Sequence, residues 1–333
     1  MQPRQSKTSS RRIDSLTRRA WAKLAAAAIL PATLGSAAGP DGLSSSRDGD
    51  ASFHPGLNLE RRYRVDAQVL LFSVPLLRRA AVGAGNIAWR EGAAPGGPIR
   101  LLEFAAWSIP GRAAGLNRLG FIRERIRLGE TGMAEAVYFG LMTVSGEENA
   151  ADARGALHSS AEETMYSAVD AHVGGESMDT ATARFPAPAA LSVSHRVELE
   201  RMARVALSGA PRKTLDFRPG DPPPPPFLHA MAELLGRPDG AEGRYVYNGG
   251  MYHLHLRRAH DAKAGEYFRS RGLAAGDVIQ VDGVLRRVNG GSPIEFRVWV
   301  EKADPHPLPL RIAYQPKSYL RLVIEAEAQR SLS

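Results

Sequence analysis

The chain has 333 residues, of which 44% are hydrophobic and 23% are charged, a composition that excludes disorder of the whole chain. The formal net charge is +8, but residues 1–38 hold 7 basic groups and 1 acidic group, which leaves 36 basic and 34 acidic residues elsewhere. A net charge of +2 on the remainder gives no reason to expect phosphate binding or a nucleic-acid partner.

The chain contains no cysteine. Disulfides, thiolate metal ligands, a thiolate nucleophile and lipid attachment through a cysteine are therefore excluded for this sequence. Stability must come from a hydrophobic core, and about 290 residues are enough to bury one.

Residues 1–38 are predicted to be a signal peptide. An arginine-rich region precedes the apolar run LAAAAILPATL and the small-residue run GSAAG, and Ser36-Ala37-Ala38 fits an A-x-A-like cleavage site. The apolar run is too short to span a bilayer, and Pro31 interrupts it. The stretch TRRAWAK resembles a bacterial twin-arginine export motif, with the general secretory route as the alternative. The expected location is periplasmic or otherwise exported; a basic tail before an ordinary helix is the competing interpretation.

Residues 39–57 are predicted to be a flexible leader, because they are rich in Gly, Ser and Asp without apolar periodicity. A single β-rich domain is expected over residues 58–328. Its first strands show period-two alternation in RYRVDAQVLLFSV, GNIAWRE, IRLLEFAAWSI, FIRERIRL and AEAVYFGLMTVS. In FIRERIRL, the side with Ile122 and Ile126 is predicted to face the core, and the arginine side is predicted to be unpacked.

The middle of the chain has weaker patterns. Residues 145–190 are small and acidic and are predicted to be an irregular surface insertion. HRVELERMARVAL fits either a helix or a strand. Residues 221–226 are predicted to be a stiff proline-rich spacer, and FLHAMAELLG a short amphipathic helix ending at Gly236.

The last third predicts an antiparallel sheet, with Asn-Gly and Asp-Gly turns between alternating runs. Prolines break the terminal stretch FRVWVEKADPHPLPLRIAYQPKSYLRLVIEAEA into three strands. One face of these strands is expected to be apolar and concave, and the other charged. The apolar residues form the predicted ligand-binding wall: Val298, Leu310, Ile312, Tyr314, Leu320 and Leu322.

Residues 225–327 carry a resemblance. FLHAMAELL, AGDVIQV and the terminal stretch, with Trp299 and Pro309 to Ile312 at matching positions, resemble a family of exported bacterial β-rich proteins of unknown function. That family is similar in fold to the periplasmic lipoprotein carriers. The resemblance implies an open or half-closed antiparallel barrel around a short helix, and it supplies no catalytic residues.

No catalytic motif is recognisable in the sequence: a nucleophile elbow, a phosphate loop, H-E-x-x-H and an EF-hand loop are all missing. His253 and His255 would point the same way from a strand and could begin a metal site, with His260, Asp261 or Glu266 as a third ligand. An exposed polar strand face explains the pair more simply. No cofactor is predicted, and His229 and His306 are expected to have no role.

The sequence therefore favours a non-enzymatic envelope protein that holds a lipid, an acyl chain or a protein segment on an apolar concave face. Any membrane contact is expected to be peripheral. Two alternatives are a hydrolase or metal-dependent enzyme with a dispersed site, and a purely structural component whose barrel is filled by its own side chains.

Overall fold

A computed structural model describes residues 54–71, 74–113, 118–129, 132–144, 163–188, 195–237, 241–259, 261–302, 304–317 and 320–328. The first strands are β1 (His54–Leu71), β2 (Val74–Ala94), β3 (Gly97–Ser108), β4 (Leu119–Gly129) and β5 (Gly132–Thr143). They are followed by β6 (Glu163–Val173), β7 (Ser177–Pro188), α3 (Arg196–Ser208), β8 (Arg212–Asp216) and α4 (Phe227–Gly236). The remaining elements are β9 (Ala241–Tyr247), β10 (Gly250–Ala259), α5 (Ala262–Ser270), β11 (Val278–Arg287), β12 (Ile294–Glu301), β13 (Arg311–Lys317) and β14 (Leu320–Ala326).

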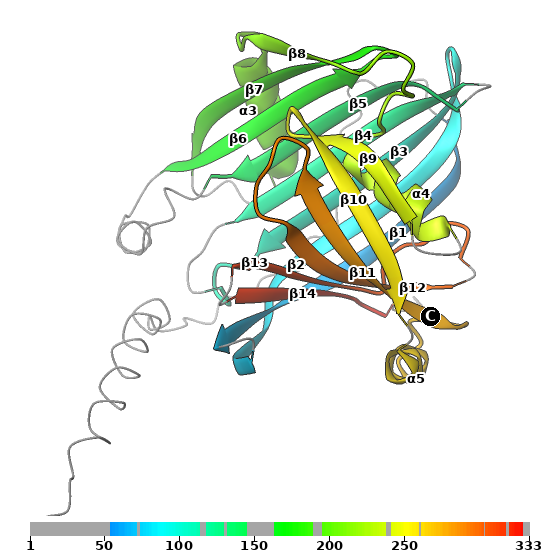
Figure 1. The fold of residues 1–333 in the computed structure, drawn as a ribbon. Helices are drawn as coiled ribbons and strands as arrows, with labels where there is room; N and C mark the ends of the chain where they lie inside the picture. The colour runs from blue at the N-terminus through cyan, green and yellow to red at the C-terminus, as the bar shows by residue number, and fades with distance from the viewer. Residues whose placement is uncertain are drawn as a thin grey trace, which may run out of the picture.

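The described strands form one 14-stranded antiparallel sheet in the order β8-β7-β6-β5-β4-β3-β2-β1-β14-β13-β12-β11-β10-β9. The sheet curls around α4 but does not close, because the edge strands β8 and β9 are not hydrogen-bonded to each other (Figure 1). The predicted mainly β, half-closed barrel with a short packed helix is confirmed. Within the described residues, no helix has the length and hydropathy needed to cross a bilayer.

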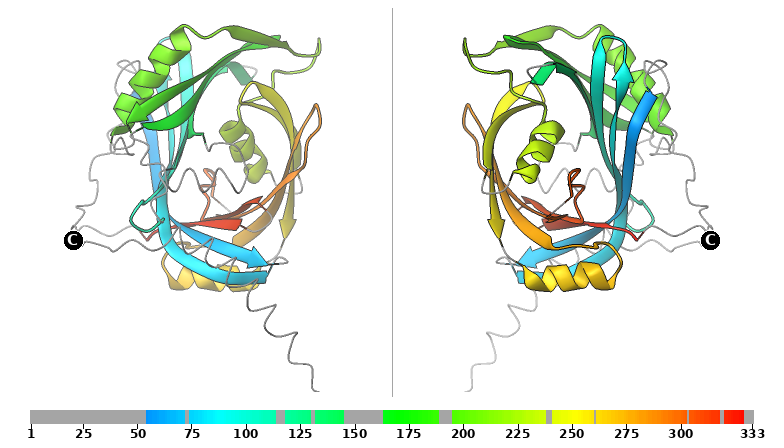
Figure 2. Two further views of the ribbon diagram at one scale, coloured as in Figure 1. Left: turned by 90° about the vertical axis from the view of Figure 1, so that its left-hand side faces the viewer. Right: turned by 90° about the vertical axis from the view of Figure 1, so that its right-hand side faces the viewer.

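The two faces of the sheet carry different helices. The side on which α4 lies is called the concave face, and the side that carries α3 and α5 is called the outer face (Figure 2). Cross-strand register assigns every residue to one of them, since side chains alternate along a strand. Both faces are therefore covered over part of their area, unlike the single covered face that the sequence predicted.

The start of the domain and the segment 145–190 differ from prediction. Strand β1 begins at His54, so residues 54–57 of the predicted leader are strand, while residues 1–53 lie outside the described residues. Residues 163–188 are not an irregular insertion but the paired strands β6 and β7. Many of their buried positions are alanine, such as Ala168 and Ala181 at 0% and 1% exposed, with Tyr166 and Phe185 among them. Small side chains suit a strand packed closely under a helix but give little hydrophobic contrast in the sequence.

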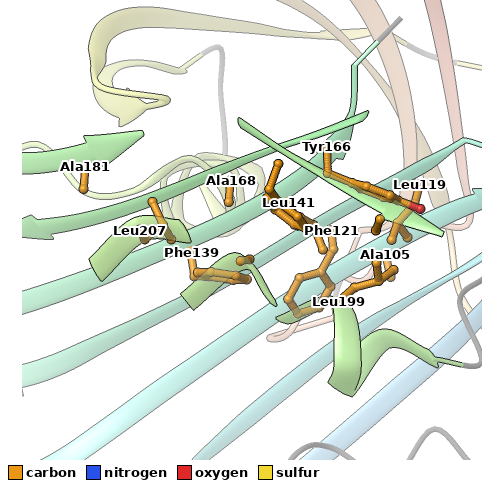
Figure 3. Close-up of a cluster of buried hydrophobic side chains, with 13 residues drawn as sticks. Ala105, Leu119, Phe121, Phe139, Leu141, Tyr166, Ala168, Ala181, Leu199 and Leu207 are labelled. Carbon is orange, nitrogen blue, oxygen red and sulfur yellow. The ribbon is translucent and has the colours of Figure 1, made fainter. Parts of the chain in front are cut away.

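Helix α3 resolves the ambiguity of HRVELERMARVAL and covers β3 to β7 on the outer face (Figure 3). Leu199 and Ala203 of α3 pack against Phe121 and Leu141 of the sheet, and all are fully buried. The arginine side of FIRERIRL is therefore packed, contrary to prediction, while Ile122 and Ile126 face the concave core as predicted. The sequence did not predict a helix on the outer face. Glu200 of α3 supplies a carboxylate to Arg123 of β4.

The proline-rich segment joins the two edges of the sheet. After β8 the chain passes along edge strand β9, where Val246 N–H donates to the Pro225 carbonyl at 3.0 Å, and then enters α4. A further contact comes from the β9–β10 turn, because Tyr138 O–H of β5 donates to Asn248 Oδ1 at 2.7 Å. Burial raises the pKa of the neighbouring Tyr247 to about 12, so this aromatic group is neutral at physiological pH. These contacts hold the barrel half-closed without a continuous ladder.

Candidate functional site

Five of the six predicted wall residues share the concave face. The register pairs Val298 with Ile312 and Tyr314 with Leu322, which places them on one side, and Leu320 follows by alternation. Leu310 is the exception: it precedes β13 and is buried on the outer face with Trp299 and Phe268 of the α5 cluster. The alternation within β13 does not extend back through Pro309, so the predicted position of Leu310 is wrong.

The wall is covered at one end only. Val298 is 1% exposed and packs in the cluster that includes Leu234 of α4, and Ile312 lies against the same cluster. Tyr314, Leu320 and Leu322 are half-buried and belong to none of the buried clusters among the described residues. These three wall residues are therefore not covered by α4.

Exposed apolar side chains from other strands gather at the uncovered end. Leu77 begins β2, Met142 ends β5, Met165 begins β6 and Ile294 begins β12, and each is 39–43% exposed. Register and alternation along the strands place all four on the concave face. In an antiparallel sheet, these strand ends meet at one end of the barrel. We call it the open end; the left view in Figure 2 looks into it, with α4 farther away.

The opposite, closed end is filled by α4 and by residues 304–310. Trp89, Leu102 and Leu308 form a buried cluster there, with Leu228 of α4 packed against it. The rings of His306 and Trp89 pack in a T-shaped arrangement at a centroid distance of 5.1 Å, so His306 has a packing role that the sequence did not predict.

A buried acid holds the start of α4. Glu124 projects from β4 into the concave core with 0% of its side chain exposed. Its carboxylate accepts the backbone N–H groups of Leu228 at 2.9 Å and His229 at 3.1 Å, and lies 3.0 Å from His229 Nδ1. The helix itself supplies no side-chain cap. A lone Glu between arginines in the sequence gave no sign of this role, and the expectation that His229 is idle is wrong.

The histidine pair does not form a metal centre within the described residues. His253 and His255 are both exposed on the outer side of β10, and His255 Nδ1 lies 4.0 Å from Glu242. Asp261, one proposed third ligand, instead accepts the Ala264 N–H as the N-cap of α5. His260 is outside the described residues. No group of three His, Asp or Glu side chains with metal-ligand geometry occurs in the described part of the chain.

The outer face carries a hollow of about 960 Å³ over β10 to β14 and β1. Its lining is rich in arginine, and it also includes Trp299, Tyr267 and Phe296. The alternation in the sequence predicts this face only as a charged surface. The signal was present as arginines at alternate positions of successive strands, but it could be recognised only once their register was known.

No family model matches the chain, and no curated protein matches it. Its fold is similar to that of a beta-barrel-like protein of a domain of unknown function (DUF1849) from Brucella abortus, with 9% identity, 82% of this chain and 98% of the other covered, and a TM-score of 0.38. The β-rich, barrel-like architecture that the resemblance implied is present in the chain's own sheet. Its relation to exported proteins and lipoprotein carriers stays a prediction.

Proposed function

We propose that the protein is an exported cell-envelope protein that holds a lipid, an acyl chain or an apolar protein segment at the open end of its concave face, without catalysing a reaction. One observation carries this proposal. Apolar side chains from β2, β5, β6, β12, β13 and β14 reach the same end of the concave face, and they are exposed or half-buried there.

Energetics support a ligand at this end. Fully burying one large apolar side chain contributes about 1.5–3 kcal/mol, so covering several partly exposed ones would favour binding by several kcal/mol. Exposed apolar surface marks a binding site when it is gathered in one place, and these side chains lie at one end of one face. At the closed end, α4 already covers the apolar side chains of the concave face. An acyl chain would therefore bind only at the open end.

Leu322→Asp is expected to weaken binding of a fluorescent fatty acid about tenfold or more, because a carboxylate would have to be desolvated beside the bound chain. The measurement is a fluorescence titration, followed by displacement with unlabelled envelope lipid. The thermal unfolding of the variant is recorded alongside, because Leu322 is half-buried and binding is compared only between folded proteins.

Val197→Asp is the matched control, since Val197 is 53% exposed on α3 at the outer face. It should bind the fatty acid as the wild type does. If the folded wild-type protein shows no saturable binding, the proposal fails, and a structural component with its interior filled by α4 becomes the better account. Equal losses in the two variants would place the site elsewhere.

Export is tested separately. We expect N-terminal sequencing of the mature protein to begin near Gly39, and replacement of Arg18 and Arg19 by lysine to block export through the twin-arginine route. Unchanged export in that variant would indicate the general secretory route. A functional cellular form that retains the first two residues would contradict export altogether.

A further inference from the structure

The hollow on the outer face has a floor of short side chains between arginines. Cross-strand register aligns six positions on neighbouring strands: Arg257, Asp282, Arg297, Ala313, Val323 and Asp66. Ala313 and Val323 stand in the middle of this row and form the floor. Arg297 flanks them on one side, and Arg78, bound to Asp66 at 2.6 Å, flanks them on the other. Long arginine side chains surround this short apolar floor, so the hollow runs along β13 and β14. We call it the trough.

The end of the trough nearest α5 is rigid. Tyr267 O–H donates to Glu325 Oε1 at 2.7 Å, and the Arg311 guanidinium also binds Glu325. Arg311 lies 4.7 Å from the Tyr267 ring centroid and 5.4 Å from that of Trp299. Stacking and ion pairing together fix this guanidinium, so the trough has a preorganised wall.

At its other end the trough passes between two strands. The β12–β13 ladder stops at the pair Phe296 and Tyr314, although β11–β12 continues to Ile294 and β13–β14 continues to Leu320. Ile294, Phe296 and Tyr314 therefore line the trough even though their register assigns them to the concave face. The splayed strands connect the charged trough with the rim of the open end.

Positive charge in and around the trough exceeds the available carboxylates. Asp282 is shared by Arg257 at 3.5 Å and Arg297 at 3.1 Å. Glu325 is approached by Arg311 and also by Arg64 at 3.7 Å and Arg271 at 3.6 Å. Arg321 lines the trough and forms no ion pair with any described residue.

Seven arginines thus surround the carboxylates of Asp66, Asp282 and Glu325. Glu295 adds only one more acidic side chain to the lining. The near-zero net charge of the chain after residue 38 hides this local excess, because acidic residues elsewhere balance it. Several of these cations also remain available to a ligand, since Arg257 and Arg297 have 76% and 60% of their side chains exposed.

We propose that this trough binds a phosphate group carried on a small organic molecule or a lipid. A phosphate monoester carries about −1.5 to −2 charges at neutral pH, which matches the excess better than a carboxylate does. Planar guanidinium groups bind phosphate oxygens in pairs. The volume lies within the range of about 300–1,000 Å³ usual for small-molecule sites, so the trough accepts more than the phosphate alone. The apolar floor and Phe296 contact the remainder of the ligand.

The test measures binding of glycerol 3-phosphate by calorimetry, and binding of phosphatidylcholine vesicles with and without phosphatidic acid by flotation. The wild type is expected to bind a probe that carries the phosphate, but neither glycerol nor pure phosphatidylcholine vesicles. Saturable binding of glycerol 3-phosphate would show that a soluble phosphate ester binds the trough without a lipid chain. Binding only to phosphatidic acid identifies a lipid headgroup.

The double variant Arg297→Gln/Arg321→Gln is expected to bind about tenfold more weakly or worse, the loss expected when charge-assisted hydrogen bonds are removed. Neither change leaves a buried carboxylate alone, because Asp282 keeps Arg257 and Arg321 has no ion-pair partner among the described residues. Arg321→Lys should fall between the wild type and Arg321→Gln, since it keeps the charge but loses the planar fork.

Arg204→Gln/Arg218→Gln is the matched control, with the same loss of charge at exposed positions outside the trough lining. It should bind as the wild type does. The proposal is overturned if the folded wild type binds neither probe, if the trough variant binds unchanged, or if both double variants lose affinity equally. Because the trough lies on the outer face, loss of phosphate binding without loss of fatty-acid binding would leave the proposed function intact.

Discussion

Replacing Glu124 by alanine is expected to lower the free energy of unfolding by about 3–5 kcal/mol, because each polar group left without its acceptor costs about 1–3 kcal/mol. The substitution removes the acceptor of two backbone N–H groups at the start of α4 and leaves His229 Nδ1 without its partner. Since His229 Nε2 has no hydrogen-bond partner in the described residues, the imidazole would lose its only polar contact there. Urea unfolding followed by circular dichroism measures the loss.

Glu135→Ala is the control, because Glu135 lies on the adjacent strand β5 with 55% of its side chain exposed. An exposed ion pair contributes about 0–1 kcal/mol, so little change is expected there. Glu124→Gln should be intermediate, since an amide oxygen still accepts one N–H. A Glu124→Ala protein as stable as the Glu135→Ala protein would mean that apolar packing alone holds α4 in the barrel.

Helix α4 and the C-terminal strands show what local pattern can predict. The spacing of apolar residues predicts the helix from Phe227 to Gly236, and strict alternation predicts the strands that follow it. Both signals are strong because each element buries large apolar side chains on one face. Strands β6 and β7 were not predicted, because several of the side chains that they bury under α3 are alanines, which give little contrast between the two faces.

The candidate sites depended on information that the sequence does not carry locally. The concave wall was predicted from alternation, but only the placement of α4 decides that Val298 is covered and Leu322 is not. The trough requires Arg78 of β2 and Arg257 of β10 to lie around one floor, which follows from the strand order. Glu124 gained its role through α4, which starts 103 positions later in the chain.

Arg123→Met is expected to lower the free energy of unfolding by about 3–5 kcal/mol at pH 7, because it leaves buried carboxylates without their shared cation. Arg123 donates to Glu103 Oε1 at 2.7 Å and to Glu200 Oε2 at 2.9 Å, and so joins β3, β4 and α3. The two carboxylate side chains are only 6% and 4% exposed. Thermal or urea unfolding measures the effect, and Arg201→Met, at an exposed pair on α3, should change stability by less than about 1 kcal/mol.

The pH dependence identifies the cause of this loss. Burial by itself would raise the pKa of Glu103, but Arg123 and Arg90 together hold it below its usual value. A lowered folded-state pKa adds stability above the unfolded pKa of about 4.3, and that stability is lost as the pH falls through the folded pKa. Arg123→Met removes part of this contribution, so the stability gap to the wild type should be full at pH 7 and shrink below about pH 4. A stability gap that stays constant with pH would assign the loss to stacking of the Arg123 guanidinium on the Phe121 ring instead.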